Sequence, residues 1–273
     1  MDSRTTAANG RVAALDLAGK VAAERFVTGE AARIGQAVVD LCGAPGGARV
    51  RQLLFGASVT VYERRDGHAF VQTGLDGYVG YVSETVLAGD GAVTHRVGTR
   101  ATHVYEAPDI KSATGLRLGF GAQIGVTAEG KRFFETPQGF IPKSHLRPLD
   151  KPFADPVTVA QLFFGAPYLW GGNSDLGIDC SGLVQAGLAA CGFDCPGDSD
   201  QQRAALGRDL ATDAAPRRGD LWFWNGHVGL VVDPETLLHA NAHHMSVAYE
   251  PLDRARLRID AQGDGPVLAR KRL

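Results

Sequence analysis

The chain has 273 residues, of which 44% are apolar and 21% are charged. This length suits two or three domains, and the apolar fraction is large enough to give each of them a core. The formal net charge is only −2 and no basic stretch accumulates, which argues against a nucleic-acid partner or an acidic membrane surface.

The first 35 residues combine a polar start with the alanine-rich stretch "AALDLAGKVAAERF" (13–26), which predicts an N-terminal helical segment over 1–35. The sequence has no pattern of a secretory signal and no run of 18 apolar residues, so we expect a cytoplasmic protein without membrane contact. Four cysteines are too few for a disulfide framework in a chain of this size, and reduced thiols are expected.

An internal repeat follows. "LLFGASVTV" (53–61) resembles "LGFGAQIGV" (118–126), and "GYVSETVL" (80–87) resembles "GFIPKSHL" (139–146). Ala44-Pro45 and Ala107-Pro108 add a third match, and the offsets of 65, 59 and 63 agree on a period of about sixty residues. Both copies alternate apolar and polar residues between Gly, Asp or Pro turns, which predicts two small β-barrels, over 36–90 and 91–150.

The pattern changes after the linker "RPLDKPFADP" (147–156). "VTVAQLFFG" and "SGLVQAGLAACG" have helical spacing of their apolar residues, whereas the region from 219 to 252 alternates and turns at Asn225-Gly226 and Asp233-Pro234. Helices followed by antiparallel strands predict an α+β domain over 151–273.

Cys180 lies in "GGNSDLGIDCSGLVQ" (171–185), between Asp179 and Ser181 and directly after a glycine-rich loop. If a helix begins here, the thiol lies at the positive end of the helix dipole, which favours a thiolate. The alternative is a small core cysteine with Asp179 as a simple N-cap. The surroundings of this cysteine alone leave both interpretations open.

Two histidines favour the catalytic interpretation. His227 opens the strand "HVGLVV", and His239 lies in the next predicted strand, "TLLHANA". Antiparallel pairing about Asp233-Pro234 sets residue 227 opposite 239–241, close enough for the two rings to form a hydrogen bond. A nucleophilic cysteine needs a base that a second side chain orients, and these residues supply that set.

These motifs resemble a known family. "YLWGG", "DCSGLVQ", "DSDQQ", "GDLWFW", "HVGLVV" and "LLHA", over about 160–250, are similar to the NlpC-type cysteine peptidases of bacteria, which have a papain-like fold. The repeated β modules resemble the tandem bacterial SH3-type domains that precede the catalytic domain in some members. The resemblance therefore implies a papain-like catalytic domain preceded by two small SH3-like β-barrels.

The resemblance also implies roles for individual residues. Cys180 matches the nucleophile, His227 the base and His239 the residue that orients the base. The residues matched to substrate binding are Tyr168, Asp179, Ser181, Ser199 and, from the first β module, Tyr78. No metal and no cofactor are implied.

The implied substrate is a short murein peptide, L-Ala-γ-D-Glu-diamino acid, cleaved at the γ-D-glutamyl bond during cell-wall recycling. Asp179 would hold the free N-terminal amine, because an ammonium group in a partly closed cleft needs an anion. Two positions depart from the family pattern: Gly197 replaces an expected Arg, and Ala57 stands where an acid is expected. The second departure leaves open whether a free N-terminal L-Ala is required.

Three other functions use the same residues. The first is a papain-like amidase or acyltransferase that acts on another amide, and the second is a non-catalytic cell-wall peptide binding protein. The third is a zinc hydrolase with His227, His239 and His243 or His244 as ligands, but the sequence has no metal motif with an acidic water-activating residue.

Overall fold

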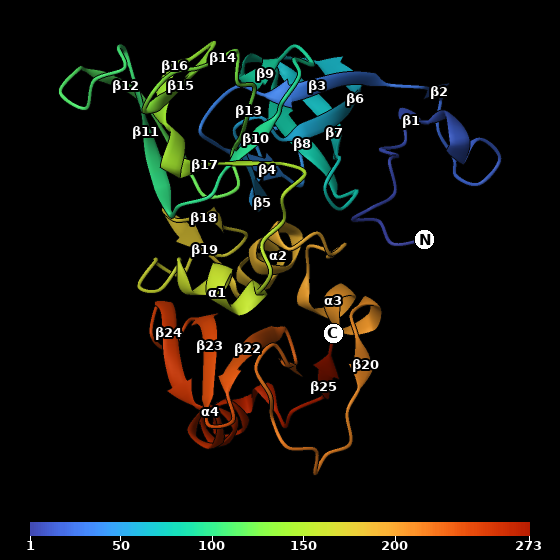
Figure 1. Ribbon diagram of the computed structural model, residues 1–273. Helices are drawn as coiled ribbons and strands as arrows, with labels where there is room; N and C mark the ends of the chain where they lie inside the picture. The colour runs from blue at the N-terminus through green and yellow to red at the C-terminus, as the bar shows by residue number, and fades with distance from the viewer. The chain divides into compact units, whose positions relative to one another are not determined.

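The computed structural model describes residues 1–273, which divide into two compact units, Met1–Asp150 and Lys151–Leu273. The first unit is built almost entirely from short strands, and the second combines helices with an antiparallel sheet (Figure 1). None of the helices has both the length and the apolar composition that a membrane crossing requires.

The start of the chain is extended rather than helical. Strand β1 (Val12–Ala14) pairs in parallel with β2 (Arg25–Val27), and only the 3-10 turn η1 (Leu15–Leu17) is helical there. The predicted N-terminal helical segment over 1–35 is therefore wrong. Alanine favours helices, but here β1 is buried against its partner strand, and Gly19 adopts a φ of 77°, outside the helical region.

The first β module is a seven-stranded sheet in the order β5-β4-β8-β7-β6-β3-β9. It begins at residue 30, before the predicted start at 36. Inward side chains from its strands form one hydrophobic core. Its elements are β3 (Glu30–Ile34), β4 (Val38–Cys42), β5 (Arg49–Leu54), β6 (Ser58–Arg65), β7 (His68–Thr73), β8 (Val79–Ser83), the 3-10 turn η2 (Glu84–Val86) and β9 (Leu87–Ala88).

The second β module has a three-stranded sheet, β13-β10-β17, and a five-stranded sheet, β12-β11-β16-β15-β14. One core of buried residues from both sheets holds it together. Its elements are β10 (His95–Val97), β11 (Ala101–Tyr105), β12 (Thr114–Gly119), β13 (Gln123–Ile124), β14 (Ala128–Glu129), β15 (Phe133–Thr136), β16 (Gly139–Pro142), the 3-10 turn η3 (Lys143–His145) and β17 (Leu146–Pro148).

The two modules repeat one pairing scheme. In the first, β3 pairs with β6 and β9, β4 with β5 and β8, and β7 with β6 and β8. In the second, β10 pairs with β13 and β17, β11 with β12 and β16, and β15 with β14 and β16. Each strand of the first module corresponds to one strand of the second, except β6, whose place is taken by β13 and β14 together. This agreement supports an internal duplication, while the SH3-type assignment of the second module stays a prediction.

The repeated "FGA" turns use the same hydrogen bonds. The Gly56 N–H donates to the Ile34 carbonyl at 2.8 Å, and the Gly121 N–H donates to the Val97 carbonyl at 3.0 Å. Both glycines have left-handed backbones, with φ of 75° and 85°. Their surroundings differ, because a Cβ on Gly56 would lie 2.0 Å from the Gln123 carbonyl oxygen, whereas one on Gly121 would meet nothing closer than 3.5 Å.

The C-terminal unit is built on a six-stranded sheet in the order β20-β25-β21-β22-β23-β24. Helix α2 packs against β22 and β23, and α4 packs against β23 and β24 (Figure 1). The antiparallel strands expected between 219 and 252 are present. The elements are α1 (Pro156–Gln161), β18 (Asn173–Ser174), β19 (Gly177–Ile178), α2 (Cys180–Ala190), α3 (Ser199–Ala205), β20 (Arg208–Asp209), β21 (Leu221–Trp224), β22 (His227–Asp233), β23 (Thr236–Asn241), β24 (Ser246–Pro251), α4 (Leu252–Ile259), the irregular helical turn η4 (Asp260–Asp264) and β25 (Ala269–Arg272).

The difference between the two repeated glycines can be tested. We expect Gly121→Ala to lower the free energy of unfolding of the N-terminal unit by about 1–2 kcal/mol, the cost of a left-handed alanine. Gly56→Ala should cost about 2–4 kcal/mol, because the clash with the Gln123 carbonyl adds to that strain. Hydrogen exchange of β3–β9 and β10–β17 in the full-length chain measures both values, and equal losses would contradict the structural difference.

Candidate active site

Cys180 is the first residue of α2, and Asp179 is the N-cap of that helix. The Asp179 Oδ1 accepts hydrogen bonds from the Gly182 N–H at 2.7 Å and from the Ser181 hydroxyl at 3.0 Å, while Oδ2 accepts from the Gly171 N–H at 2.8 Å. One buried carboxylate thus ties the preceding glycine-rich loop to the start of the helix. The predicted helix start at Asp179–Cys180 is confirmed.

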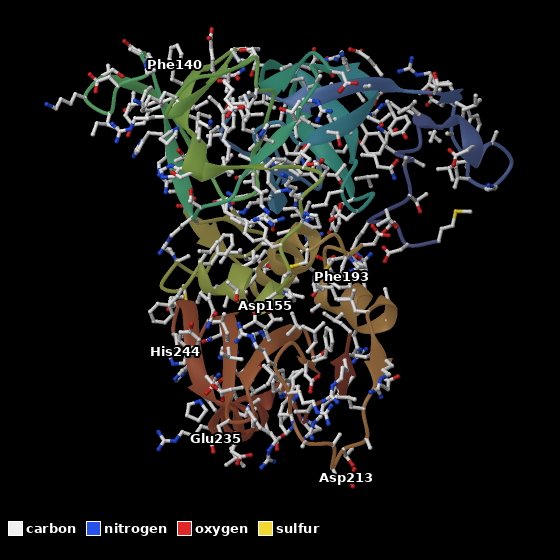
Figure 2. The ribbon with its side chains drawn as sticks, viewed as in Figure 1. Phe140, Asp155, Phe193, Asp213, Glu235 and His244 are labelled. Carbon is white, nitrogen blue, oxygen red and sulfur yellow. The ribbon has the colours of Figure 1, made fainter.

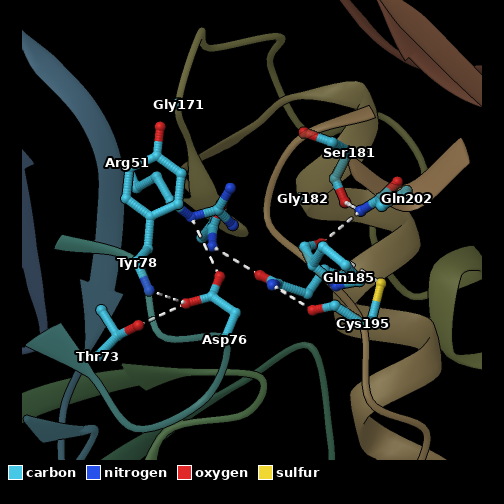
Figure 3. Close-up of polar contacts among 12 residues, drawn as sticks. Arg51, Thr73, Asp76, Tyr78, Gly171, Ser181, Gly182, Gln185, Cys195 and Gln202 are labelled. Atoms are coloured by element: carbon cyan, nitrogen blue, oxygen red, sulfur yellow. Dashed lines mark hydrogen bonds and ion pairs between the residues drawn. The ribbon is translucent and has the colours of Figure 1, made fainter. Parts of the chain in front are cut away.

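The loop and the helix approach each other closely. A Cβ on Gly182 would lie 2.6 Å from the Gly172 carbonyl oxygen and 2.8 Å from Asn173 Oδ1. The first turn of α2 therefore accepts only a residue without a side chain at this point. On its other side, Gln202 of α3 donates to the Ser181 carbonyl at 2.9 Å (Figure 3). The backbone around Cys180 is held from two directions.

The thiol of Cys180 lies against the backbone that flanks His227. Its Sγ is 3.9 Å from the Gly226 carbonyl oxygen, and the Val228 N–H also faces the sulfur. Cys180 is only 6% exposed. The helix start and the first residues of β22 therefore meet at the sulfur atom, although they are 46 residues apart in the chain.

His227 and His239 form a hydrogen bond. The Nε2 of His227 is 2.9 Å from the Nδ1 of His239, which confirms the predicted cross-strand proximity. The Nε2 of His239 is in turn 3.1 Å from Glu250 Oε2. Arg258 of α4 donates from Nε to Glu250 Oε1 at 2.9 Å and from Nη2 to Oε2 at 2.7 Å. His227, His239, Glu250 and Arg258 thus form one line of hydrogen bonds.

Strand register brings these side chains together. The two-residue Asn225-Gly226 turn pairs His227 with Trp224, and Trp224 packs in the core between the sheet and α4. Leu237 belongs to the same core, and His239 lies two residues beyond it on the same face. Glu250 is paired with Leu237 across β23 and β24, which makes it a diagonal neighbour of His239.

Burial favours the neutral forms of both reacting groups. It raises the pKa of the Cys180 thiol to about 12, an effect that the nearby Asp179 reinforces and that the N–H groups around the sulfur oppose. Burial and the neighbouring His239 lower the pKa of His227 below its ordinary value. The expectation that the helix dipole makes a resting thiolate is therefore wrong for this structure, because desolvation outweighs the N–H groups at the start of the helix.

The line behind His227 has a fixed charge distribution. Burial alone would raise the pKa of Glu250, but the hydrogen bonds from Arg258 and His239 outweigh it and hold that pKa well below the usual range. Glu250 is thus ionised. Burial lowers the pKa of His239 against the opposing effect of Glu250, so this fully buried ring is neutral. The arrangement can deliver general-base catalysis by a neutral imidazole.

The residues predicted to bind substrate have different placements. Tyr168 is half-buried, and burial together with the charges of Cys180 and Asp179 raises the pKa of its hydroxyl, which therefore keeps its proton. Asp179 and Ser181 flank the thiol and bond to each other. Ser199 is half-buried at the start of α3. The substrate-binding roles of these residues stay predictions.

Tyr78 belongs to the N-terminal unit. Its N–H donates to Asp76 Oδ1 at 3.1 Å, and Thr73 donates its hydroxyl proton to the same carboxylate (Figure 3). The Arg51 guanidinium lies over the Tyr78 ring, 5.4 Å from its centre. Ala57, where the family pattern has an acid, packs against the core of the first module. The role of Tyr78 in the cleft stays a prediction.

Sequence reasoning missed Glu250, Arg258 and Gln202. Glu250 had one usable signal, since it is a single acid in the otherwise alternating stretch "SVAYEPL" (246–252) next to the strand of His239. Arg258, the penultimate residue of α4, gave no such signal, because two other arginines occupy the same helix. Only the packing of α4 on the sheet selects it.

A possible metal-ligand set overlaps the line. His239, His244 and Glu250 offer donor atoms within 4.8 Å of one another. His244 lies in the turn between β23 and β24 (Figure 2). Glu250 and the Nε2 of His239 already bond to each other, and Arg258 occupies both carboxylate oxygens with a positive charge. This donor set fits a hydrogen-bond relay better than a cation site.

Two family matches cover parts of the chain. The NlpC/P60 family matches residues 165–258, and the family described as "Bacterial dipeptidyl-peptidase Sh3 domain" matches residues 41–87. The first range contains Cys180, His227, His239 and Glu250, and the second covers most of the first β module. Residues matched to these families therefore lie in both compact units.

Known proteins resemble larger parts of the chain. Dipeptidyl-peptidase 6 of Lysinibacillus sphaericus is 26% identical over 231 residues, covering 75% of this chain and 84% of that protein. The crystal structure of an NlpC/P60 family protein from Bacillus cereus superposes with a TM-score of 0.75 at 19% identity, over 89% of this chain and 99% of that one. An NlpC/P60 endopeptidase from Photobacterium damselae gives a TM-score of 0.56 at 14% identity, over 88% and 70%. At these identities, the two structures show a shared fold.

The electrostatics of the thiol predict a specific pH dependence. Because the pKa of Cys180 is raised to about 12, its thiolate fraction should increase about tenfold per pH unit across the neutral and mildly alkaline range. We expect the rate of Cys180 alkylation by iodoacetamide, followed by mass spectrometry, to rise steadily from pH 6 to pH 9. The same cysteine in the denatured chain should level off near its ordinary pKa of about 8.5. A rate that is already constant below pH 7 would reveal a preformed thiolate and contradict the assignment.

Proposed function

We propose that this chain, which is an NlpC-type cysteine peptidase with a bacterial SH3-type domain, hydrolyses the γ-D-glutamyl bond to the diamino acid in short murein peptides. The proposed substrate is L-Ala-γ-D-Glu-diamino acid with a free N-terminus. In this proposal Cys180 is the nucleophile, His227 the base and His239 the residue that orients the base.

The observation that carries this proposal is the meeting of the Cys180 sulfur with the backbone around His227, at the end of a buried line of hydrogen bonds. A core cysteine needs no such line, whereas a nucleophile needs a base with an oriented proton-accepting nitrogen. The distances of 2.9 Å and 3.1 Å along His227, His239 and Glu250 meet that requirement. A peptide-binding protein without activity would have no use for this alignment.

The first chemical step is acylation. The Cys180 sulfur attacks the γ-carbonyl carbon of D-Glu while its proton moves to His227, which matches a neutral resting pair. The Cys180 N–H and the Tyr168 hydroxyl are candidate donors to the oxyanion, and one such donor is typically worth about 3 kcal/mol. His227 then gives its proton to the leaving amine of the diamino acid, and the C–N bond breaks to leave a thioester on Cys180.

The second step is hydrolysis of the thioester. His227, neutral again, takes a proton from a water molecule, and the resulting hydroxide attacks the thioester carbon. The C–S bond breaks, and the sulfur recovers its proton from His227. The products are L-Ala-D-Glu and the free diamino acid or the peptide that begins with it.

Asp179 lies next to the nucleophile, and its carboxylate binds both the start of α2 and the glycine-rich loop. In this proposal the same carboxylate attracts the ammonium group of the N-terminal L-Ala. Asp179 would then cap the helix and also hold the N-terminus of the peptide at a fixed distance from Cys180, which determines the bond that is cut.

A cytoplasmic role in wall-peptide recycling belongs to the same proposal, and the four free cysteines agree with a reducing compartment. The second candidate is a papain-like amidase or acyltransferase that uses the same residues on another amide. A substrate panel separates the two, because only the peptidase releases a free diamino acid from murein peptides.

Loss of the nucleophile gives a direct test. Cys180→Ala should abolish cleavage of L-Ala-γ-D-Glu-L-Lys, with a loss of at least about 10³-fold in kcat, because no other group can form the thioester. Cys191→Ala removes a half-buried thiol at the other end of α2 and serves as the matched control, with activity near that of the native chain. Product masses from the native chain identify the bond. Normal cleavage by Cys180→Ala would refute the mechanism.

The role of the substrate amine predicts a preference for free N-termini. Acetylation of the N-terminal L-Ala removes its charge, and the lost bond to Asp179 should lower kcat/KM about 10- to 100-fold. Acetylating the ε-amine of the Lys residue instead provides the control, because that group lies beyond the bond that is cut. Equal kcat/KM values for the free and N-acetylated peptides would remove Asp179 from amine recognition.

A further inference from the structure

We propose that Glu250, held by Arg258, is a positioning residue that fixes the proton of His239 on Nε2 and so leaves the Nδ1 of His227 free to accept the Cys180 proton. This inference rests on the proposed roles of Cys180, His227 and His239. It adds two residues to the machinery that neither the sequence motifs nor the strand of His227 identifies.

The contacts around His239 leave it only two partners for its ring nitrogens. The ring is fully buried, with Nδ1 at 2.9 Å from the Nε2 of His227 and Nε2 at 3.1 Å from Glu250 Oε2. The Glu250 side chain is also nearly buried. Since both nitrogens face side-chain atoms, the direction of the two hydrogen bonds decides which nitrogen carries the proton.

That direction follows from the carboxylate. An ionised Glu250 can only accept a hydrogen bond, so the Nε2 of His239 must carry the proton that it donates. In a neutral ring the Nδ1 of His239 is then an acceptor, and it takes a hydrogen bond from the Nε2–H of His227. The remaining nitrogen of His227, Nδ1, is left without a proton in the neutral ring. This is the protonation state that a general base needs.

Arg258 gives the carboxylate its orientation. Its Nε and Nη2 bind the two oxygens of Glu250 at 2.9 Å and 2.7 Å, a two-point contact that fixes the carboxylate plane. The guanidinium charge also offsets that of Glu250 at the histidines, since the two act in opposite senses on the pKa of His227. The pair therefore acts on His227 mainly by fixing the direction of the hydrogen bonds, and its net effect on the pKa of His227 is small.

A second buried ion pair in the same sheet has no contact with a histidine. Asp220 and Arg272 form the same two-point contact, with both N···O distances at 2.7 Å, where β21 begins. Asp220 is 1% exposed and bonds to no histidine. Pairing with β22 sets His227 against the opposite end of β21. This pair therefore reports what the loss of a buried ion pair does to the domain in general.

Two double variants separate positioning from stability. The double variant Glu250→Met/Arg258→Met removes the acceptor without leaving a lone buried charge, and its kcat should fall about 100-fold with KM within twofold. Asp220→Met/Arg272→Met is the control, with kcat and KM within about threefold. A double Glu250/Arg258 variant with kcat within about threefold of the native value overturns the proposal, and so does an equal fall in the control.

A measurement on the unaltered chain does not depend on folding of the variants or on the substrate. Nitrogen NMR of ¹⁵N-histidine-labelled protein at neutral pH reports which ring nitrogens carry protons, and spectra of single histidine variants assign the signals. We expect protons on the Nε2 of both His227 and His239 and none on either Nδ1. A proton on the Nδ1 of His239 overturns the inference. Failure to cleave murein peptides would count against the proposed substrate alone, because this result would stand.

Discussion

A histidine buried inside a β-sheet must find a partner for each ring nitrogen, and this constraint organises the C-terminal unit. His239 meets it with His227 on one side and Glu250 on the other. The cost of burying Glu250 is offset in turn by Arg258, which requires α4 to pack on this face of the sheet. The hydrogen-bond partners linked to this single ring thus come from β22, β24 and α4.

The same constraint explains the resting state of the site. The burial of His239 extends to Cys180 and His227, where it favours the uncharged form of each. The helix start supplies N–H groups around the sulfur, but they do not outweigh desolvation. The charge of the site lies in the Glu250–Arg258 pair while Cys180 and His227 are neutral, which suits the proposed general-base catalysis.

The N-terminal unit depends on a different device. Two β modules share a pairing scheme and a left-handed glycine turn, with Gly56 and Gly121 bonded to equivalent strands. The turn of the first module also contacts the second, since the Gln123 N–H donates to the Phe55 carbonyl at 2.8 Å. The Gly56 turn of the first module therefore packs tightly against Gln123 of the second module and has no room for a Cβ. The equivalent Gly121 turn has that room.

The sequence by itself determined the features that depend on local pattern and chain order. These are the repeat of about sixty residues, the helix that begins at Cys180, the hairpins around Asn225 and Asp233 and the contact between His227 and His239. Alanine content misled the prediction for residues 1–35, because pairing of β1 with β2 overrides helix propensity. Only the tertiary structure decided the desolvation of Cys180 and the selection of Glu250 and Arg258. The burial of Cys180 and the selection of one of the three arginines on α4 depend on how the helices pack against the sheet. Residue spacing along the chain does not determine that packing.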